Sequence, residues 1–122
     1  MLCTNNADQT EAKRFKHFTI GNETEKYVFD YESVYDGYSI HELFVNHIKG
    51  MKFSTPNQDN DKSGGDCANQ YPGGWWFGSC LADFFNGRYG STKYASGIHW
   101  YVITNLNKSL KKTMMMVKEN DD

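Results

Sequence analysis

The residues best suited to chemistry are concentrated between positions 59 and 80. In the stretch DNDKSGGD, Asp59, Asp61 and Ser63 lie two positions apart, and Gly64 and Gly65 follow. A hard cation such as Ca2+ takes several oxygen ligands in a flexible arrangement, and alternating side chains with backbone carbonyls can supply them. Asp, Asn, Ser and Gly are also ordinary turn residues. The spacing alone therefore leaves open a cation-binding loop and a solvated turn.

The stretch matches only the first half of an EF-hand loop. Counting from Asp59, the ninth position is Cys67 and the twelfth is Gln70, where an EF-hand has a bidentate Glu. No strongly helical pattern flanks the stretch. If the loop binds calcium, we expect a site that is not an EF-hand.

Three cysteines are present, and two of them flank the segment CANQYPGGWWFGSC. A bridge between Cys67 and Cys80 would close a loop of about 14 residues and stabilise the fold by roughly 3 kcal/mol. Such bridges are typical of oxidising compartments. Cys3 is then the odd cysteine, and its partner would lie on another chain or on a segment outside this sequence.

Two N-x-[ST] sequons, at Asn22 and Asn107, also favour a secreted protein. Chance occurrence of both sequons is an equal alternative. The first residues lack the apolar core of a signal peptide. We therefore expect a secreted, extracellular protein whose natural start is missing from this chain.

Composition excludes several other classes. The net charge of −2 gives no overall basic footprint for nucleic acid. No apolar run approaches the ~20 residues of a membrane span. Aromatic residues make up 16% of the 122 positions, which is typical of a folded domain rather than a disordered chain. We expect one loop-rich domain with a small aromatic core.

Trp75 and Trp76 are adjacent, so they cannot share one face of a strand. We expect one to fill the core and the other to pack over the bridge, with the preceding glycines giving the backbone room. A second interpretation is that Tyr71, Phe77 and Tyr94 line a shallow apolar pocket, since aromatic walls with a few polar groups form binding sites for small neutral groups.

The elements that must position these residues are short. Alternation and β-branched or aromatic content predict strands over 15–21, 26–37, 97–104 and 111–117, the first two forming an antiparallel pair joined through Asn22 and Glu23. Ser39 and Glu42 form a capping box that predicts a short helix over 39–48. Residues 51–55 should be extended, residues 56–97 mostly irregular, and residues 1–12 and 119–122 polar tails.

Nothing in the sequence indicates catalysis. The four histidines, His17, His41, His47 and His99, have no metal-binding spacing such as H-E-x-x-H. A Cys–His hydrolase would need a free thiolate, whereas Cys67 and Cys80 fit a bridge better. We predict that the protein is not an enzyme.

The segment from Gly50 to Gly90 resembles the fibrinogen C-terminal domain of fibrinogens, ficolins, tachylectins, angiopoietins and tenascins. The shared features are F-S-T, then D-x-D before C-A, then G-G-W-W-x-x-x-C and N-G-x-Y, and the motifs SGIHW and SLKKTMMMV extend the likeness. The resemblance covers roughly residues 13–118. It implies an α+β, fibrinogen C-terminal-like fold with a small antiparallel sheet, short helices and a loop-rich calcium-binding subdomain, truncated by loss of the N-terminal subdomain. Within it, residues 13–55 would be the central sheet region, 56–97 the calcium and pocket region, and 98–118 the closing strands.

The resemblance also implies specific site residues. The family calcium ligands fall on the side chains of Asp59 and Asp61 and on the carbonyls of Ser63 and Gly65. The family disulfide falls on Cys67 and Cys80.

The implied ligand pocket lies beside the calcium loop. In lectin-like members the peptide bond before the second cysteine is cis, which here is the bond from Ser79 to Cys80. Leu81 replaces a common histidine, and Ala95, which follows Tyr94, replaces the aspartate that binds a peptide amine in fibrinogen. An alanine there, with aromatic walls at Tyr71 and Tyr94, favours an acetyl methyl group.

Two functions follow from the resemblance. One is a secreted, calcium-stabilised module that mediates extracellular protein interaction. The alternative is lectin-like recognition of acetylated glycans in innate defence. Neither involves nucleic acid or membrane insertion, and any oligomerisation would use segments absent from this sequence.

Overall fold

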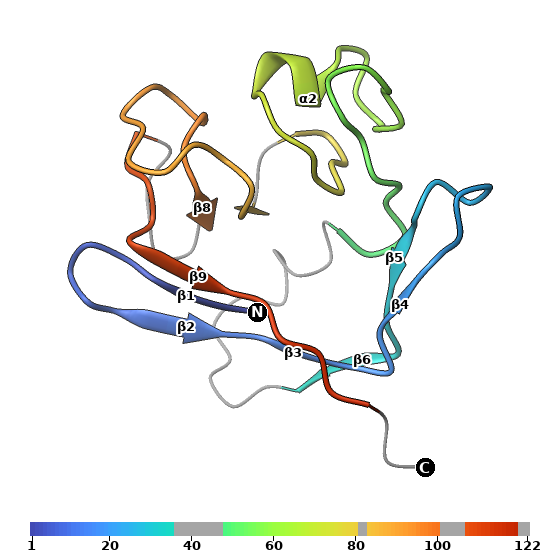
Figure 1. The fold of residues 1–122 in the computed structure, drawn as a ribbon, viewed down its shortest axis with the longest axis horizontal. Coiled ribbons are helices and arrows are strands. Elements are labelled where there is room, and N and C mark those ends of the chain that lie inside the picture. The colour runs from blue at the N-terminus through green and yellow to red at the C-terminus, as the bar shows by residue number, and fades with distance from the viewer. Residues whose placement is uncertain (36–47, 81–82, 101–106, 120–122) are drawn as a thin grey trace.

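The computed structural model describes residues 1–35, 48–80, 83–100 and 107–119 (Figure 1). Its strands are β1 (Leu2–Thr4), β2 (Thr10–Ala12), β3 (Arg14–Lys16), β4 (Thr19–Ile20), β5 (Phe29–Asp30), β6 (Ser33–Tyr35), β7 (Asp83–Phe84), β8 (His99–Trp100) and β9 (Lys112–Met114), and its described helix is α2 (Cys67–Gln70). These strands form one three-stranded and three two-stranded sheets, and every pairing among them is antiparallel. The small antiparallel sheets agree with the predicted fold class.

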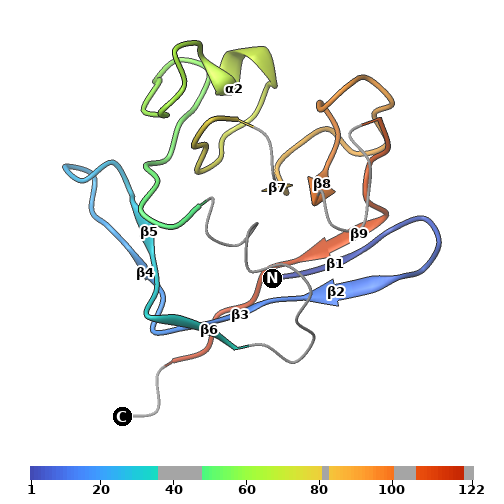
Figure 2. The same cartoon turned by 180° about the vertical axis from the view of Figure 1, so that it is seen from behind.

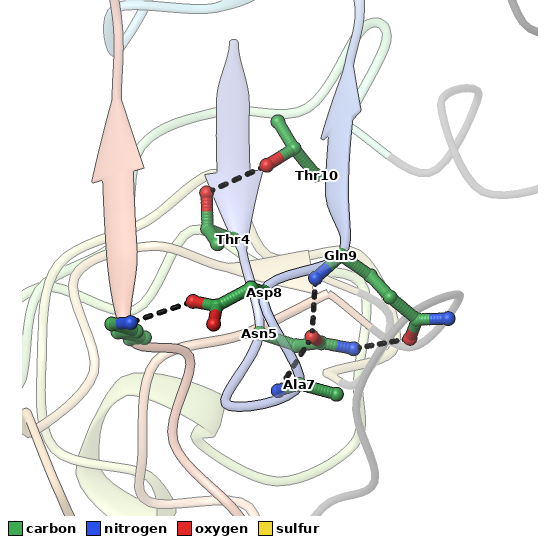
Figure 3. Close-up of polar contacts among 7 residues, drawn as sticks. Thr4, Asn5, Ala7, Asp8, Gln9 and Thr10 are labelled. Carbon is green, nitrogen blue, oxygen red and sulfur yellow. Dashed lines mark hydrogen bonds and ion pairs between the residues drawn. The ribbon is translucent and has the colours of Figure 1, made fainter.

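The prediction that residues 1–12 form a tail is wrong. They contain β1 and β2, and the strand order is β2-β1-β9. Cys3 lies opposite Glu11 on one side and Thr113 on the other. The turn between β1 and β2 is fixed by Asn5, whose Oδ1 accepts hydrogen bonds from the backbone N–H groups of Ala7 and Gln9, both at 3.0 Å (Figure 3). The central strand therefore depends on a partner more than a hundred residues away, which no local pattern reveals.

The predicted strand pair over 15–21 and 26–37 is antiparallel, as expected, but it is divided into two shorter pairs. β3 pairs with β6 and β4 pairs with β5. The break on the first strand falls at His17, which has φ +50°, a conformation that does not continue a strand. At the far end, the side chain of Asn22 accepts a hydrogen bond from the N–H of Glu25 at 3.0 Å, so the expected turn begins at Asn22.

The region between residues 56 and 97 is mostly irregular, as predicted, where the structure describes it. α2 is four residues long, and β7 is two. The predicted strand over 97–104 is realised in β8, and that over 111–117 in β9. The predicted helix over 39–48 lies outside the described residues except at its last position. Within the described parts of the chain, no helix has the length and apolar character needed to cross a bilayer.

The core is aromatic. The irregular segment that carries α2 and the sheet of β1, β2 and β9 lie on different sides of the ribbon (Figures 1 and 2). Trp75 is 1% exposed and forms the centre of the core, with ring contacts to Trp76 and Phe85. Trp76 is half-buried, packs on Phe29 and Phe53, and donates its indole N–H to the carbonyl of Tyr27 at 2.9 Å. One tryptophan thus fills the core, and the other joins β5 to the irregular segment.

The two glycines before the tryptophans are required by packing. A Cβ atom at Gly73 would lie 2.6 Å from a ring carbon of Phe84, and one at Gly74 would lie 2.9 Å from the ring of Phe53. Both distances are shorter than real Cβ contacts. The expectation that these glycines give the backbone room is confirmed.

Candidate metal and ligand site

The acidic loop is held against the core by backbone hydrogen bonds at both ends. Ser54 forms a bridge with Trp75, and its Oγ accepts a hydrogen bond from the N–H of Asn60 at 2.9 Å. The amide of Asn60 donates to the carbonyl of Phe53 at 3.0 Å. Further along, the N–H of Lys62 donates to the carbonyl of Gly78 at 3.0 Å. The loop is therefore anchored to the segment that follows the tryptophans.

Three carboxylates converge in this loop. Oxygen atoms from Asp59, Asp61 and Asp66 all lie within 4.8 Å of one another. The carboxylate of Asp61 accepts hydrogen bonds from the N–H groups of Ser63 at 2.8 Å and Cys67 at 2.9 Å. These bonds fold the loop back on itself, so that the three side chains face one another. The cluster could bind a metal ion.

The electrostatics of the cluster agree with that possibility. Burial raises the pKa of Asp61, the N–H groups of Cys67 and Ser63 lower it, and a hydrogen bond with Asp59 and its charge raise it again. The net shift of the pKa is upward, mainly because burial disfavours the charged carboxylate, and repulsion from Asp59 adds to it. A bound cation would reverse this, because it neutralises the repulsion between the carboxylates. The donor set, made of hard oxygens, fits Ca2+.

The structure adds Asp66 to the residues that the resemblance implied. Asp66 is the N-cap of α2, and its Oδ1 accepts a hydrogen bond from the N–H of Asn69 at 3.1 Å. In the sequence it is the last acidic residue of DNDKSGGD, and only the loop closure at Asp61 brings it to the cluster. The Oγ of Ser63 accepts a hydrogen bond from the N–H of Gly65 at 3.1 Å. The carbonyls of these two residues remain predicted ligands that rest on the resemblance.

The disulfide joins the loop to the tryptophan segment. Cys67 and Cys80 are bonded, with Cα atoms 5.3 Å apart. Cys67 follows Asp66 directly and begins α2. The bridge thus fixes the helix that carries one of the three clustered carboxylates.

The peptide bond from Ser79 to Cys80 is trans, so the cis bond implied by the resemblance is not present in this structure. The chain reverses instead at Cys80, whose φ is +74°. This left-handed conformation is uncommon for a residue with a side chain. Cys80 has this conformation while it is bonded to Cys67 and packs, half-buried, against the core.

The predicted pocket residues have different environments. Tyr94 is 55% exposed, whereas Ala95 beside it is fully buried with φ +56°. Tyr71 is half-buried and packs against the core. Phe77 is 1% exposed and contacts Phe84, so the expectation that it lines a surface pocket is wrong. Leu81 lies outside the described residues.

Each of the two histidines in the described part of the chain contacts a polar group of the protein. His17 is exposed and lies 2.6 Å from a carboxylate oxygen of Glu32. His99 is buried, with Nδ1 3.0 Å from the carbonyl of Gly97, and burial lowers its pKa. His41 and His47 lie outside the described residues.

The remaining predicted positions concern modification and redox state. Asn22 and Asn107 are both exposed, as glycosylation would require. Cys3 is a fully buried free cysteine, and burial together with the charge of Glu11 raises the pKa of its thiol to about 12. Such a thiol is inert in the folded protein.

The sequence of this chain is similar to those of several curated proteins. Ryncolin-4 from Cerberus rynchops is 36% identical over 107 residues, covering 85% of this chain and 30% of the relative. Fibrinogen C domain-containing protein 1 from Xenopus tropicalis is 42% identical over 72 residues, covering 57% of this chain and 16% of the relative. The chain therefore spans less than a third of the length of these curated relatives.

Solved structures show the same fold. The lamprey fibrin D-dimer, in complex with the peptide Gly-His-Arg-Pro-amide, superposes with a TM-score of 0.76 at 28% identity, over 90% of this chain and 41% of that one. The fibrinogen-like globe domain of human ANGPTL2 gives a TM-score of 0.76 at 25% identity, over 90% and 52% of the two chains.

The family model for the C-terminal globular domain of fibrinogen beta and gamma chains matches residues 2–120. Members of this family are binding modules rather than enzymes, which confirms the prediction that this protein is not an enzyme. The chain belongs to the fibrinogen C-terminal globular domain family.

Proposed function

We propose that this protein is a secreted, calcium-stabilised binding module that mediates extracellular protein interaction. The observation that carries the proposal is the cluster of Asp59, Asp61 and Asp66, held together by hydrogen bonds and fixed by an adjacent disulfide. A disulfide belongs to an oxidising compartment, and calcium is abundant outside the cell. A disulfide and a bound calcium ion both stabilise the fold most where a segment has little regular secondary structure of its own.

In this proposal the side chains of Asp59 and Asp61 and the carbonyls of Ser63 and Gly65 hold the ion, with Asp66 as a further carboxylate. When bound, calcium neutralises the carboxylates and ties the loop to α2. In the same proposal, Tyr71 and Tyr94 provide aromatic contacts to the bound partner on the surface beside the acidic loop. The region from 56 to 97 is thus the binding region, and the sheets on either side support it.

Recognition of acetylated glycans is the second candidate function. It is supported by the exposed ring of Tyr94, since an aromatic wall suits a small neutral group such as an acetyl methyl. The next residue, Ala95, is fully buried. The same residue argues against the peptide class bound by the lamprey fibrin relative. A peptide amine needs a carboxylate partner, and Ala95 has none.

Calorimetric titration of calcium into the oxidised chain tests the first step. The double variant Asp59→Ala, Asp61→Ala should lose binding, and a matched control, Glu23→Ala, Glu119→Ala, should keep it. Equal binding by both variants would show that the cluster is not the site.

A glycan array, run with calcium and with EDTA, then separates the two functions. Calcium-dependent binding to acetylated sugars would favour the lectin function. Calcium binding in the titration, together with no binding to acetylated sugars on the array, would favour protein interaction. An array signal that EDTA does not change would contradict a calcium-supported pocket.

A further inference from the structure

The C-terminal third of the chain carries a strong positive charge that the net charge conceals. Residues 84–118 contain six Lys or Arg and no Asp or Glu. Because the whole chain carries −2, the residues outside this segment carry −8. Such separation of charge within one domain creates a local field that attracts oppositely charged partners.

Five of these six side chains belong to two segments that the fold places together. They are Arg88, Lys93, Lys108, Lys111 and Lys112, which we call the basic face, and all five are exposed. A backbone hydrogen bond joins the two segments, from the N–H of Leu110 to the carbonyl of Ile98 at 2.7 Å. Within the first segment, the N–H of Arg88 donates to the carbonyl of Ser96 at 2.8 Å and closes the loop that carries Arg88 and Lys93. Both ribbon views show the loop before β8 beside the chain that leads into β9 (Figures 1 and 2).

A carboxylate from the N-terminal hairpin contacts the basic face. Asp8 lies in the turn between β1 and β2, and its Oδ1 accepts a hydrogen bond from Nζ of Lys111 at 2.6 Å (Figure 3). Both side chains are more than half exposed, so the pair is weak and readily exchanged for a stronger anion. Next to this pair, Tyr89 is 70% exposed and interacts electrostatically with Lys111.

We propose that the basic face binds a sulfated polysaccharide. Sulfate groups accept charge-assisted hydrogen bonds from Lys and Arg, and the exposed ring of Tyr89 offers an apolar surface for a sugar ring. The Cys67–Cys80 disulfide places the protein in an oxidising compartment, where sulfated glycans rather than nucleic acids are the abundant polyanions. None of the clustered carboxylates of the acidic loop belongs to this face, so binding should not require calcium.

Heparin is the probe, and the oxidised full chain in EDTA is the protein. The variant Arg88→Ala, Lys93→Ala, Lys108→Ala should bind at least about tenfold more weakly at 0.15 M salt, because each lost charge removes a screened but direct attraction. The matched control is Arg14→Ala, Lys52→Ala, Lys62→Ala, which removes three exposed cations elsewhere and should change affinity by less than about twofold. A charge-keeping variant, Arg88→Lys, Lys93→Arg, Lys108→Arg, should bind like the wild type and shows that the effect is not a folding defect.

Three comparison ligands test whether the basic face recognises a sulfated glycan rather than another polyanion. Fully desulfated heparin has the same sugar backbone and should bind much more weakly than heparin. A duplex oligonucleotide or a phosphatidylserine vesicle that binds as tightly as heparin would overturn the assignment to a glycan. Absence of heparin binding, or equal losses in the basic-face variant and its control, would overturn the proposal as a whole.

Discussion

Asp83 is a buried carboxyl group whose replacement by asparagine should stabilise the protein at neutral and higher pH. Its side chain is in β7, and the residue is 7% exposed. Burial raises its pKa from 3.8 to about 7, although its own backbone N–H and the indole N–H of Trp75 lower it. Within the described residues this indole N–H has no hydrogen-bond partner, and burial is the largest of the three effects. Asparagine keeps the shape and removes the charge.

The magnitude follows from the difference between the folded and unfolded pKa. Below 3.8 the Asp83 carboxyl group is protonated in both states, and the folded state bears no penalty. As the pH rises toward about 7, the unfolded chain ionises first, so the stability falls by up to about 1.4 kcal/mol per pH unit. The total loss is at most about 4 kcal/mol above pH 7. Relaxation around the ionised group makes this an upper bound.

The assay is urea unfolding followed by tryptophan fluorescence at several pH values. The difference in unfolding free energy between Asp83→Asn and wild type should be near zero at about pH 4 and reach roughly 2–4 kcal/mol at about pH 8. The exposed Asp30→Asn variant is the control and should show no such trend. His99, whose pKa is lowered by burial, contributes a slope of opposite sign near its titration. Because both proteins contain it, His99 cancels in the difference.

The result that would refute this reasoning is a difference that does not change with pH. It would mean that Asp83 has an ordinary pKa in the folded state and therefore reaches water. A variant less stable than wild type at every pH would mean that the carboxyl group makes a hydrogen bond that the amide cannot replace.

Three further predictions concern packing and cysteine chemistry. Replacing both cysteines of the disulfide with serine should lower the unfolding free energy by about 3 kcal/mol; calorimetry that shows an unchanged melting temperature would contradict this. Gly73→Ala should destabilise the protein by roughly 1–3 kcal/mol, because its φ is +154° and the new Cβ would lie 2.6 Å from Phe84. Gly64→Ala, with no atom within 4 Å of the new Cβ, is the control and should have little effect on urea unfolding. Cys3 should react with a thiol reagent only at the rate of unfolding, and immediate modification would show that it is accessible.

Local spacing predicted the acidic loop and the bridge because their determinants are local. Asp59 and Asp61 lie two positions apart, and the turn that brings them together involves only their neighbours. The bridge spans thirteen positions and encloses turn-forming residues. Both features could therefore be recognised in a short window of sequence, and the family resemblance assigned their roles.

The features that sequence reasoning missed depend on distant partners. The polar sequence of residues 1–12 predicts a tail, whereas β1 is ordered by hydrogen bonds to partners that include β9 at the other end of the chain. Asp83 gave no signal, since only the packing of β7 against the Trp75 core makes an ordinary acidic residue a buried one. An aromatic residue in a loop has the same pattern whether it faces water or the core, which is why the sequence left a pocket position open for Phe77.

The same contacts explain why the acidic loop, the disulfide and the aromatic core are best regarded as one unit. The carboxylate of Asp61 accepts from the N–H of Cys67, and Cys67 is bonded to Cys80. Between the two cysteines, Trp75 anchors the segment to Ser54, whose side chain in turn holds the start of the loop. Loss of any one of these three supports loosens the other two, because each orders backbone that regular secondary structure does not. The basic face contributes no residue to this unit, so we expect heparin binding to be the same with and without calcium.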